Sequence, residues 1–170
     1  MPTTFDKHKE YWTNKSGIPS ALLDWLPDPS GLQILDLGCA GGRLAISLAD
    51  KATVFGLDYS AELLKQAQEH NPTIQFICGD FQSPDAWSQI PPLDLIVSNC
   101  ALRQDFCNLF KVAELCHKHT KPDGMILLRI QAMEDLSDVL PIEIRESLLF
   151  TKSDVIESFG KFFNVTIHIE

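Results

Sequence analysis

The residues best suited to chemistry in this chain are polar side chains that end short apolar runs. Asp36 closes one such run, a turn of small residues follows it, and a helical pattern begins after the turn. This succession of strand, tight loop and helix is typical of the first part of a nucleotide-binding βαβ unit. A carboxylate before the turn would repel a pyrophosphate but attract an ammonium group. We therefore expect a nucleoside ligand that carries a positively charged amino group.

The turn after Asp36 contains little side-chain bulk, since its residues are Gly38, Cys39, Ala40, Gly41 and Gly42. A ligand can then lie against the main chain, and the backbone can adopt a positive φ where the turn requires one. A dinucleotide site fits less well, because its motif ends in a glycine or alanine where this chain has the bulky Arg43.

Further polar residues follow the next two apolar runs. Asp58 comes twenty residues after Gly38, the distance expected of an acid that pairs with ribose hydroxyls. Tyr59 would flank the ribose or the adenine. Asp80 would accept a hydrogen bond from the adenine amino group, and the main-chain amide of Phe81 would meet a ring nitrogen.

The elements that must position these residues alternate between apolar and amphipathic segments. We predict strands over residues 34–37, 53–57, 74–78, 93–97, 125–130 and 164–169, and helices over 16–26, 42–50, 61–70 and 103–120, with shorter ones after Ser83 and Thr151. Continuously apolar strands between helices indicate a doubly wound α/β fold, with a mostly parallel sheet covered on both faces. Right-handed crossovers place the carboxyl ends of parallel strands on one edge, where such folds bind ligands. Four of the polar candidates should meet there: Asp36, Asp58, Asp80 and Asn99.

The composition limits the classes of function. A length of 170 residues suits one domain, which we divide into an N-terminal cap segment (1–30), a ligand-binding core (31–130) and C-terminal helices with a last strand (131–170). The net charge of -9 disfavours nucleic acid as a partner. There is no signal-peptide pattern and no apolar run of membrane-spanning length. The five cysteines show no CxxC spacing, so we expect reduced thiols in a cytoplasmic protein.

Simpler interpretations stand beside these. Asp58 would also serve as a helix cap that shares its role with Ser60, while Asp80 and Asn99 would also serve as turn residues. His117 and His119 lie two residues apart on a predicted helix, so their side chains diverge and we expect no metal site.

Five segments of the chain, in order and spacing, resemble the class I S-adenosylmethionine-dependent methyltransferases of Rossmann-like fold: ILDLGCAGGRLA, VFGLDYSAELLKQA, IQFICGDF, LDLIVSNCALR and KPDGMILLRI. The resemblance covers about residues 32 to 130. It implies S-adenosylmethionine as the cofactor, with Asp36 near its methionine amino group and Ser98 and Asn99 near its reacting methyl. It also implies the strand order 3-2-1-4-5-7-6, of which strand 7 has no counterpart in this sequence.

Two positions depart from the family pattern. Ala40 stands where the family usually has the middle glycine of its loop. Asn99 is followed by Cys100 and Ala101 instead of the Pro-Pro-aromatic run of enzymes that methylate amide or adenine nitrogens, which argues against those acceptors.

We expect methyl transfer to a small molecule, with an oxygen or a carboxylate favoured, and we identify no general base. Tyr11 and Trp12 precede the first predicted helix, in a segment that covers the pocket in many members of the family; ordinary aromatic packing is the alternative. Arg103 follows the fourth strand and would bind an acidic substrate group, unless it is a solvated charge. Two other functions stay open: a protein methyltransferase, or a non-catalytic scaffold that pairs with a second copy or a partner subunit at the sheet edge.

Overall fold

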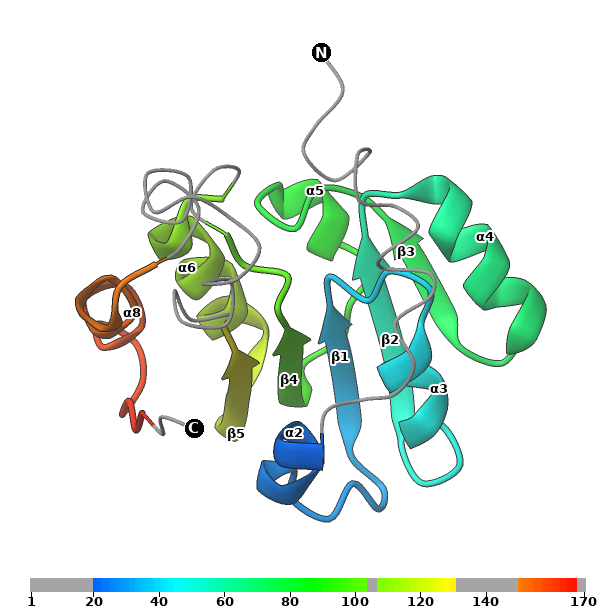
Figure 1. The fold of residues 1–170 in the computed structure, drawn as a ribbon, viewed down its shortest axis with the longest axis horizontal. Helices are drawn as coiled ribbons and strands as arrows, with labels where there is room; N and C mark the ends of the chain where they lie inside the picture. The colour runs from blue at the N-terminus through cyan, green and yellow to red at the C-terminus, as the bar shows by residue number, and fades with distance from the viewer. Residues whose placement is uncertain (1–19, 104–106, 131–149, 168–170) are drawn as a thin grey trace, which may run out of the picture.

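Five parallel strands form one sheet in the order β3-β2-β1-β4-β5 (Figure 1). They are β1 (Gln33–Leu37), β2 (Thr53–Asp58), β3 (Gln75–Cys78), β4 (Leu93–Asn99) and β5 (Thr120–Arg129). The computed structural model describes residues 20–103, 107–130 and 150–167. The predicted order of the first five strands is confirmed, and the chain reverses its direction of travel across the sheet between β1 and β4. Ligands bind at the carboxyl end of such a reversal in open α/β sheets.

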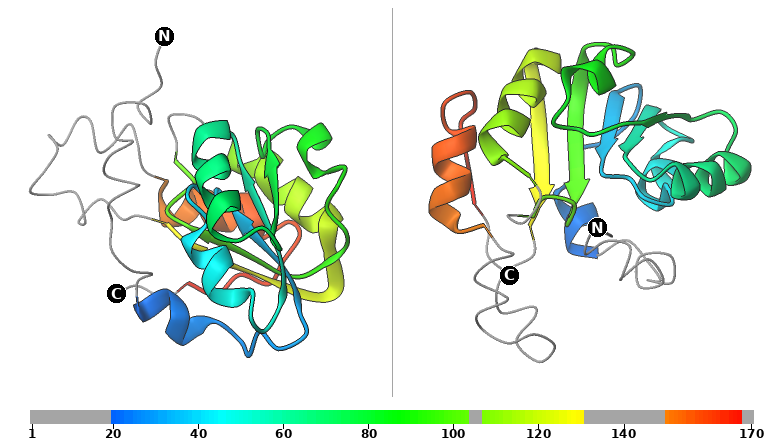
Figure 2. Two further views of the ribbon diagram at one scale, coloured as in Figure 1. Left: turned by 90° about the vertical axis from the view of Figure 1, so that its right-hand side faces the viewer. Right: turned by 90° about the horizontal axis from the view of Figure 1, so that it is seen from above.

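Helices cover both faces of the sheet (Figure 2). They are α2 (Ser20–Trp25), α3 (Arg43–Leu48), α4 (Ala61–His70), α5 (Pro84–Trp87), α6 (Leu109–His119) and α8 (Lys152–Phe159). Successive strand residues point to opposite sides. Ile34 and Leu95 therefore join a core cluster with α3, whereas Leu35 and Ile96 join a second cluster with α5 and α6. The doubly wound fold expected from the apolar strands is confirmed.

Helix α6 begins six residues later than the predicted helix over 103–120. The Asn108 side chain accepts a hydrogen bond from the Lys111 amide at 3.1 Å and so caps the helix. The Asn108 amide in turn donates to the Gln82 side chain at 2.7 Å, which ties this point to the segment after β3. The apolar pattern alone does not reveal that cap, so the predicted start was wrong.

The predicted strand over 164–169 is also wrong where the structure describes it, because residues 164–167 form no strand. After α8 the amides of Phe162 and Phe163 both donate to the Phe159 carbonyl, which makes a turn. Phe162, Phe163 and Val165 then pack against the core cluster without a ladder. Their apolar side chains are partly buried by this packing alone, so the apolar pattern wrongly predicted a strand.

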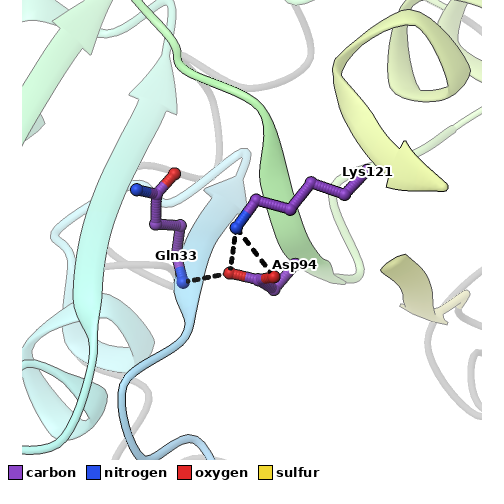
Figure 3. Close-up of polar contacts among 3 residues, drawn as sticks. All are labelled: Gln33, Asp94 and Lys121. Carbon is purple, nitrogen blue, oxygen red and sulfur yellow. Dashed lines mark hydrogen bonds and ion pairs between the residues drawn. The ribbon is translucent and has the colours of Figure 1, made fainter. Parts of the chain in front are cut away.

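A polar clamp joins three strands at the amino edge of the sheet (Figure 3). Asp94 accepts a hydrogen bond from the Gln33 amide at 2.9 Å and forms an ion pair of 2.8 Å with Lys121. The ladder shifts register here, since Leu93 pairs with Thr120 but Leu95 pairs with Met125. The clamp therefore holds β1, β4 and β5 together where the regular pairing of β4 with β5 is interrupted.

Candidate functional site

Two acidic side chains are buried at the ends of β1 and β2. Asp36 is 2% exposed and Asp58 is 5% exposed. Burial, the largest cause, and the nearby charge of Asp58 together raise the pKa of Asp36 to about 7, against the lowering effect of a hydrogen bond from the Ala45 amide. Burial also raises the pKa of Asp58. The two carboxyl groups therefore share one environment, in which a cation or several hydrogen-bond donors would stabilise their ionised forms.

Asp58 holds the loop that follows β1. Its Oδ2 accepts a hydrogen bond from the Ala40 amide at 2.9 Å, and its Oδ1 accepts one from the Ser60 amide at 2.9 Å. Ala40 has a φ of 47°, a left-handed conformation that costs energy in a residue with a side chain. The cap of α4 is Ser60, whose hydroxyl accepts from the Leu63 amide, so Asp58 itself is not the helix cap.

The loop fits tightly between the ends of β2 and β4. Gly38 and Gly42 have left-handed φ angles of 74° and 72°. The amides of Gly38 and Cys39 both donate to the Leu57 carbonyl, at 2.8 and 3.3 Å. A Cβ atom on Gly38 would collide with the Ala101 side chain. A glycine is therefore required at position 38 by both conformation and contact.

The end of β4 carries an unsatisfied polar group. The Ser98 hydroxyl donates to the Leu37 carbonyl at 2.8 Å, which locks β4 to β1. The Oδ1 atom of Asn99, in contrast, is buried and has no hydrogen-bond partner in the described part of the chain. Burying an acceptor without a hydrogen bond costs free energy, and a donor on a bound ligand would remove that cost. Cys100, the next residue, has a φ of 58°, so backbone strain also gathers here.

Asp80 follows β3 at the same edge of the sheet. Its side chain is exposed, and its Oδ1 accepts from the Gln82 amide at 2.8 Å, so it forms a turn. The Gly79 amide donates to the Asp58 carbonyl at 2.9 Å and thereby ties the end of β3 to the end of β2. Nearby, Phe81 is buried and Tyr59 is 41% exposed. Ligand roles for Asp80, Phe81 and Tyr59 stay predictions.

The candidate substrate-binding residues from the sequence are Tyr11, Trp12 and Arg103. Tyr11 and Trp12 lie outside the described residues. Arg103 lies in the segment after β4, where its carbonyl accepts from the Cys107 amide at 3.1 Å, and its role with a substrate stays a prediction. Arg129, which ends β5, was not singled out in the sequence; a charged residue closing an apolar run is the signal that would have found it.

Residues 20–103, 107–130 and 150–167 contain no group of three or more His, Cys, Asp or Glu residues that is arranged to hold a metal ion. No helix among them has the length and apolar character needed to cross a membrane.

Residues 28–156 match the family described as "Methyltransferase domain". The chain therefore belongs to the class I S-adenosylmethionine-dependent methyltransferases, as the resemblance predicted, and the cofactor of that family is S-adenosylmethionine. A trans-aconitate 2-methyltransferase of Azoarcus sp. (strain BH72) is 27% identical over 134 residues, which are 76% of this chain and 51% of that protein. A malonyl-[acyl-carrier protein] O-methyltransferase of Pectobacterium atrosepticum is 32% identical over 121 residues, or 69% of this chain and 46% of that protein. This chain thus spans about half the length of such curated relatives.

Solved structures agree with the fold. An S-adenosylmethionine-dependent methyltransferase from Mesorhizobium loti superposes with a TM-score of 0.60 at 27% identity, covering 67% of this chain and 53% of that one. A TehB-like methyltransferase from Corynebacterium glutamicum gives a TM-score of 0.69 at 21% identity, covering 95% of this chain and 84% of that one. At that identity the second match shows the shared fold alone.

Proposed function

We propose that this chain transfers a methyl group from S-adenosylmethionine to an oxygen of a small-molecule acceptor, with a carboxylate favoured. The observation that carries the proposal is the pair of buried carboxyl groups, Asp36 and Asp58, at adjacent strand ends beside a glycine loop. Family membership follows from the sequence match and the fold. Within the site of this chain, the two carboxyl groups are the feature that would favour a ligand with a positive charge and several hydroxyl groups.

The residues present fit that cofactor. Asp36 would accept hydrogen bonds from its amino group, and Asp58 from its ribose hydroxyls. A carboxylate has about four acceptor positions, so the backbone bonds that each already accepts leave capacity for a ligand. The buried Asn99 Oδ1 would gain the donor that it lacks.

The other predicted contacts extend from that pair. The main chain of the loop, including Gly38, Cys39, Ala40 and Gly42, would lie against the ligand. Gly41 leaves open space, because a Cβ atom there would meet nothing within 4 Å. We assign the adenosine end to Tyr59, Asp80 and Phe81.

For methyl transfer, the main task of the protein is to orient the acceptor toward the methyl group. The bound cofactor supplies an activated methyl carbon, which bonds to an acceptor lone pair while its bond to sulfur breaks and the electron pair stays on sulfur. A carboxylate is already ionised at neutral pH, so no side chain has to remove a proton from it. This chain would contribute by holding the acceptor in line and by excluding water.

Two kinds of relative support an acidic acceptor. Their names specify trans-aconitate and the malonyl group on acyl-carrier protein, and both contain carboxylates. A phosphoethanolamine N-methyltransferase of Triticum aestivum, 31% identical over 139 residues, represents the competing class with a nitrogen acceptor. An amine must lose a proton before it can attack, and no base is assigned in this site, which favours the oxygen acceptor. The net charge of -9 disfavours nucleic acid.

The test begins with calorimetry of the chain with S-adenosylhomocysteine and S-adenosylmethionine. Turnover is then measured as release of S-adenosylhomocysteine with trans-aconitate, malonate, phosphoethanolamine and a mixture of soluble proteins. We expect binding of both nucleosides and turnover with the acids. Asp58→Ala should abolish binding, while Asp85→Ala, which removes an exposed carboxylate from α5, should not change it. Absence of binding in the wild type would refute the proposal.

A non-catalytic subunit is the second candidate. The observation in its favour is β5, the edge strand of the described sheet, where Met125 is 48% exposed. Binding of the cofactor without turnover, together with a dimer or complex in light scattering, would favour it.

A cytoplasmic location fits the cysteines, none of which forms a disulfide in the structure.

A further inference from the structure

Arg129 brings a positive charge to the edge where the cofactor residues lie. It ends β5 and pairs with Asn99 across the ladder from β4. Its carbonyl accepts a hydrogen bond from the Cys100 amide at 2.8 Å, and its Nη1 donates to the Cys100 sulfur at 2.9 Å. The guanidinium group therefore turns back across the end of β4, next to the residue that carries the unsatisfied oxygen.

The partner of this guanidinium group is a weak one. A thiol sulfur is a poor acceptor, whereas a guanidinium group has five N–H donors in a planar fork. The ion pairs recorded within residues 20–103, 107–130 and 150–167 are Lys118 with Glu114 and Lys121 with Asp94, so Arg129 has no carboxylate partner there. A partly buried cation in this state would gain most from a carboxylate, which can accept two of its N–H groups at once.

The charges at this edge are separated. The carboxyl groups of Asp36 and Asp58 lie at the ends of β1 and β2, and the guanidinium group of Arg129 lies across β4 from them, at the end of β5. A cationic ligand is drawn to the first side and an anionic one to the second. Asn99 stands between the two sides, at the end of β4, with its buried acceptor still unpaired.

We propose that Arg129 binds a carboxylate of the methyl acceptor, an inference that rests on the function proposed above. A carboxylate held by two N–H donors is a weakened nucleophile, because the hydrogen bonds occupy its lone pairs and stabilise its charge. The oxygen that receives the methyl group therefore belongs to a second group. The acceptor class is a small organic acid with at least two carboxylates, one bound by Arg129 and one methylated.

The experiment compares Arg129→Gln and Arg129→Lys with Lys118→Gln, a control that removes the same charge from an exposed position on α6. The affinity for S-adenosylhomocysteine is measured first by calorimetry. Steady-state kinetics then follow with trans-aconitate and fumarate, which carry several carboxylates, and with crotonate, which carries one. Thermal unfolding verifies that each variant is folded.

We expect Arg129→Gln to raise the KM for trans-aconitate and fumarate by about 10- to 100-fold, the loss typical of one charge-assisted pair. Its affinity for S-adenosylhomocysteine should stay within about twofold of the wild type, a separation that a general structural role would not produce. Arg129→Lys keeps the charge without the fork and should raise the KM by a smaller factor. Lys118→Gln should match the wild type, and crotonate should be a poor substrate of every variant.

Three results would overturn the inference while leaving the cofactor site intact: equal use of crotonate and fumarate by the wild type, no turnover of any acid, or an unchanged KM in Arg129→Gln. A parallel loss of S-adenosylhomocysteine affinity in Arg129→Gln would assign Arg129 to the loop instead of the acceptor. If Arg129→Gln does not fold, the KM of Arg129→Lys decides. Failure of the wild type to bind S-adenosylhomocysteine would refute the proposed function itself, and the inference with it.

Discussion

At the amino edge of the sheet Asp94 is partly exposed, and both of its oxygens are bonded to partners on neighbouring strands. At the carboxyl edge Asp36 and Asp58 are buried beside each other. The pKa values of these carboxyl groups are shifted in opposite directions at the two edges. Hydrogen bonds from Lys121 and then from the Gln33 amide lower the pKa of Asp94, whereas burial raises the pKa of both Asp36 and Asp58.

The difference separates residues that are paired within the fold from residues that we propose bind a ligand. The amino edge has paired charges around a register shift. The carboxyl edge combines buried carboxyl groups, an unpaired amide oxygen at Asn99, and left-handed backbone at Ala40 and Cys100. Unfavourable features of this kind persist where the surrounding structure enforces them, and they cluster at functional sites.

The largest effect should come from the charge of Asp36. Between pH 4 and about 7 the folded state keeps a proton on Asp36 that the unfolded state has lost, so stability should fall as pH rises through this window. A shift from 3.8 to about 7 corresponds to at most about 4 kcal/mol. Asp36→Asn should remove most of that fall. Urea unfolding of both proteins from pH 4 to 8 measures it, and parallel pH profiles would contradict the assignment.

Cofactor affinity should change with pH in the opposite sense. The ionised form of Asp36 attracts an ammonium group, so S-adenosylhomocysteine should bind more tightly at pH 8 than at pH 6. Asp36→Asn should bind it weakly at both values. Calorimetry in buffers of different ionisation enthalpy reports the proton released on binding, and release of no proton by the wild type would count against this role.

Gly38→Ala should destabilise the fold by about 2 to 4 kcal/mol, since the new methyl both disfavours the left-handed backbone and collides with Ala101. Ala40→Gly is the matched control two residues away. It should leave stability unchanged or raise it by about 0.5 kcal/mol, because glycine tolerates the φ of 47°. Urea unfolding compares the two variants, and equal losses would show that the loop is not built as described.

Asn99→Ala should separate stability from binding. Removal of a buried acceptor that has no partner should leave stability unchanged or raise it by about 1 kcal/mol. Turnover or cofactor affinity should nevertheless fall by about tenfold, since a ligand donor loses its acceptor. Unfolding curves and calorimetry test both parts, and a clear loss of stability would mean that Asn99 has a structural role.

The smallest effect is expected at the amino edge. Lys121→Met should cost about 0.5 kcal/mol or less, because the ion pair with Asp94 is partly exposed, and high salt should reduce the difference. The lowered pKa of Asp94 means that its contribution is present above about pH 4 and is lost as the pH falls below that value. Binding of S-adenosylhomocysteine should not change. A change would show that the two edges are coupled.

Much of the fold follows from local pattern. Apolar strands separated by amphipathic segments predicted the five strands and their parallel sheet, while their order came from the resemblance to the class I methyltransferases. Capping residues predicted the starts of α4 at Ser60 and α8 at Thr151. Elements whose form depends on distant contacts were predicted less well. The start of α6 depends on Asn108, whose amide bonds to Gln82, and the segment after α8 packs on the core instead of pairing as a strand.

The sequence by itself determined which polar residues close the strands, because strand ends follow from hydrophobic periodicity and parallel strands share one edge. Only the tertiary structure decided how those residues differ: Asp36 and Asp58 buried together, Asp80 exposed in a turn, Asn99 unpaired and Arg129 folded back over β4. The physical reason is that burial, pKa and hydrogen-bond satisfaction depend on neighbours in space. Those neighbours come from strands and loops that lie far apart along the chain.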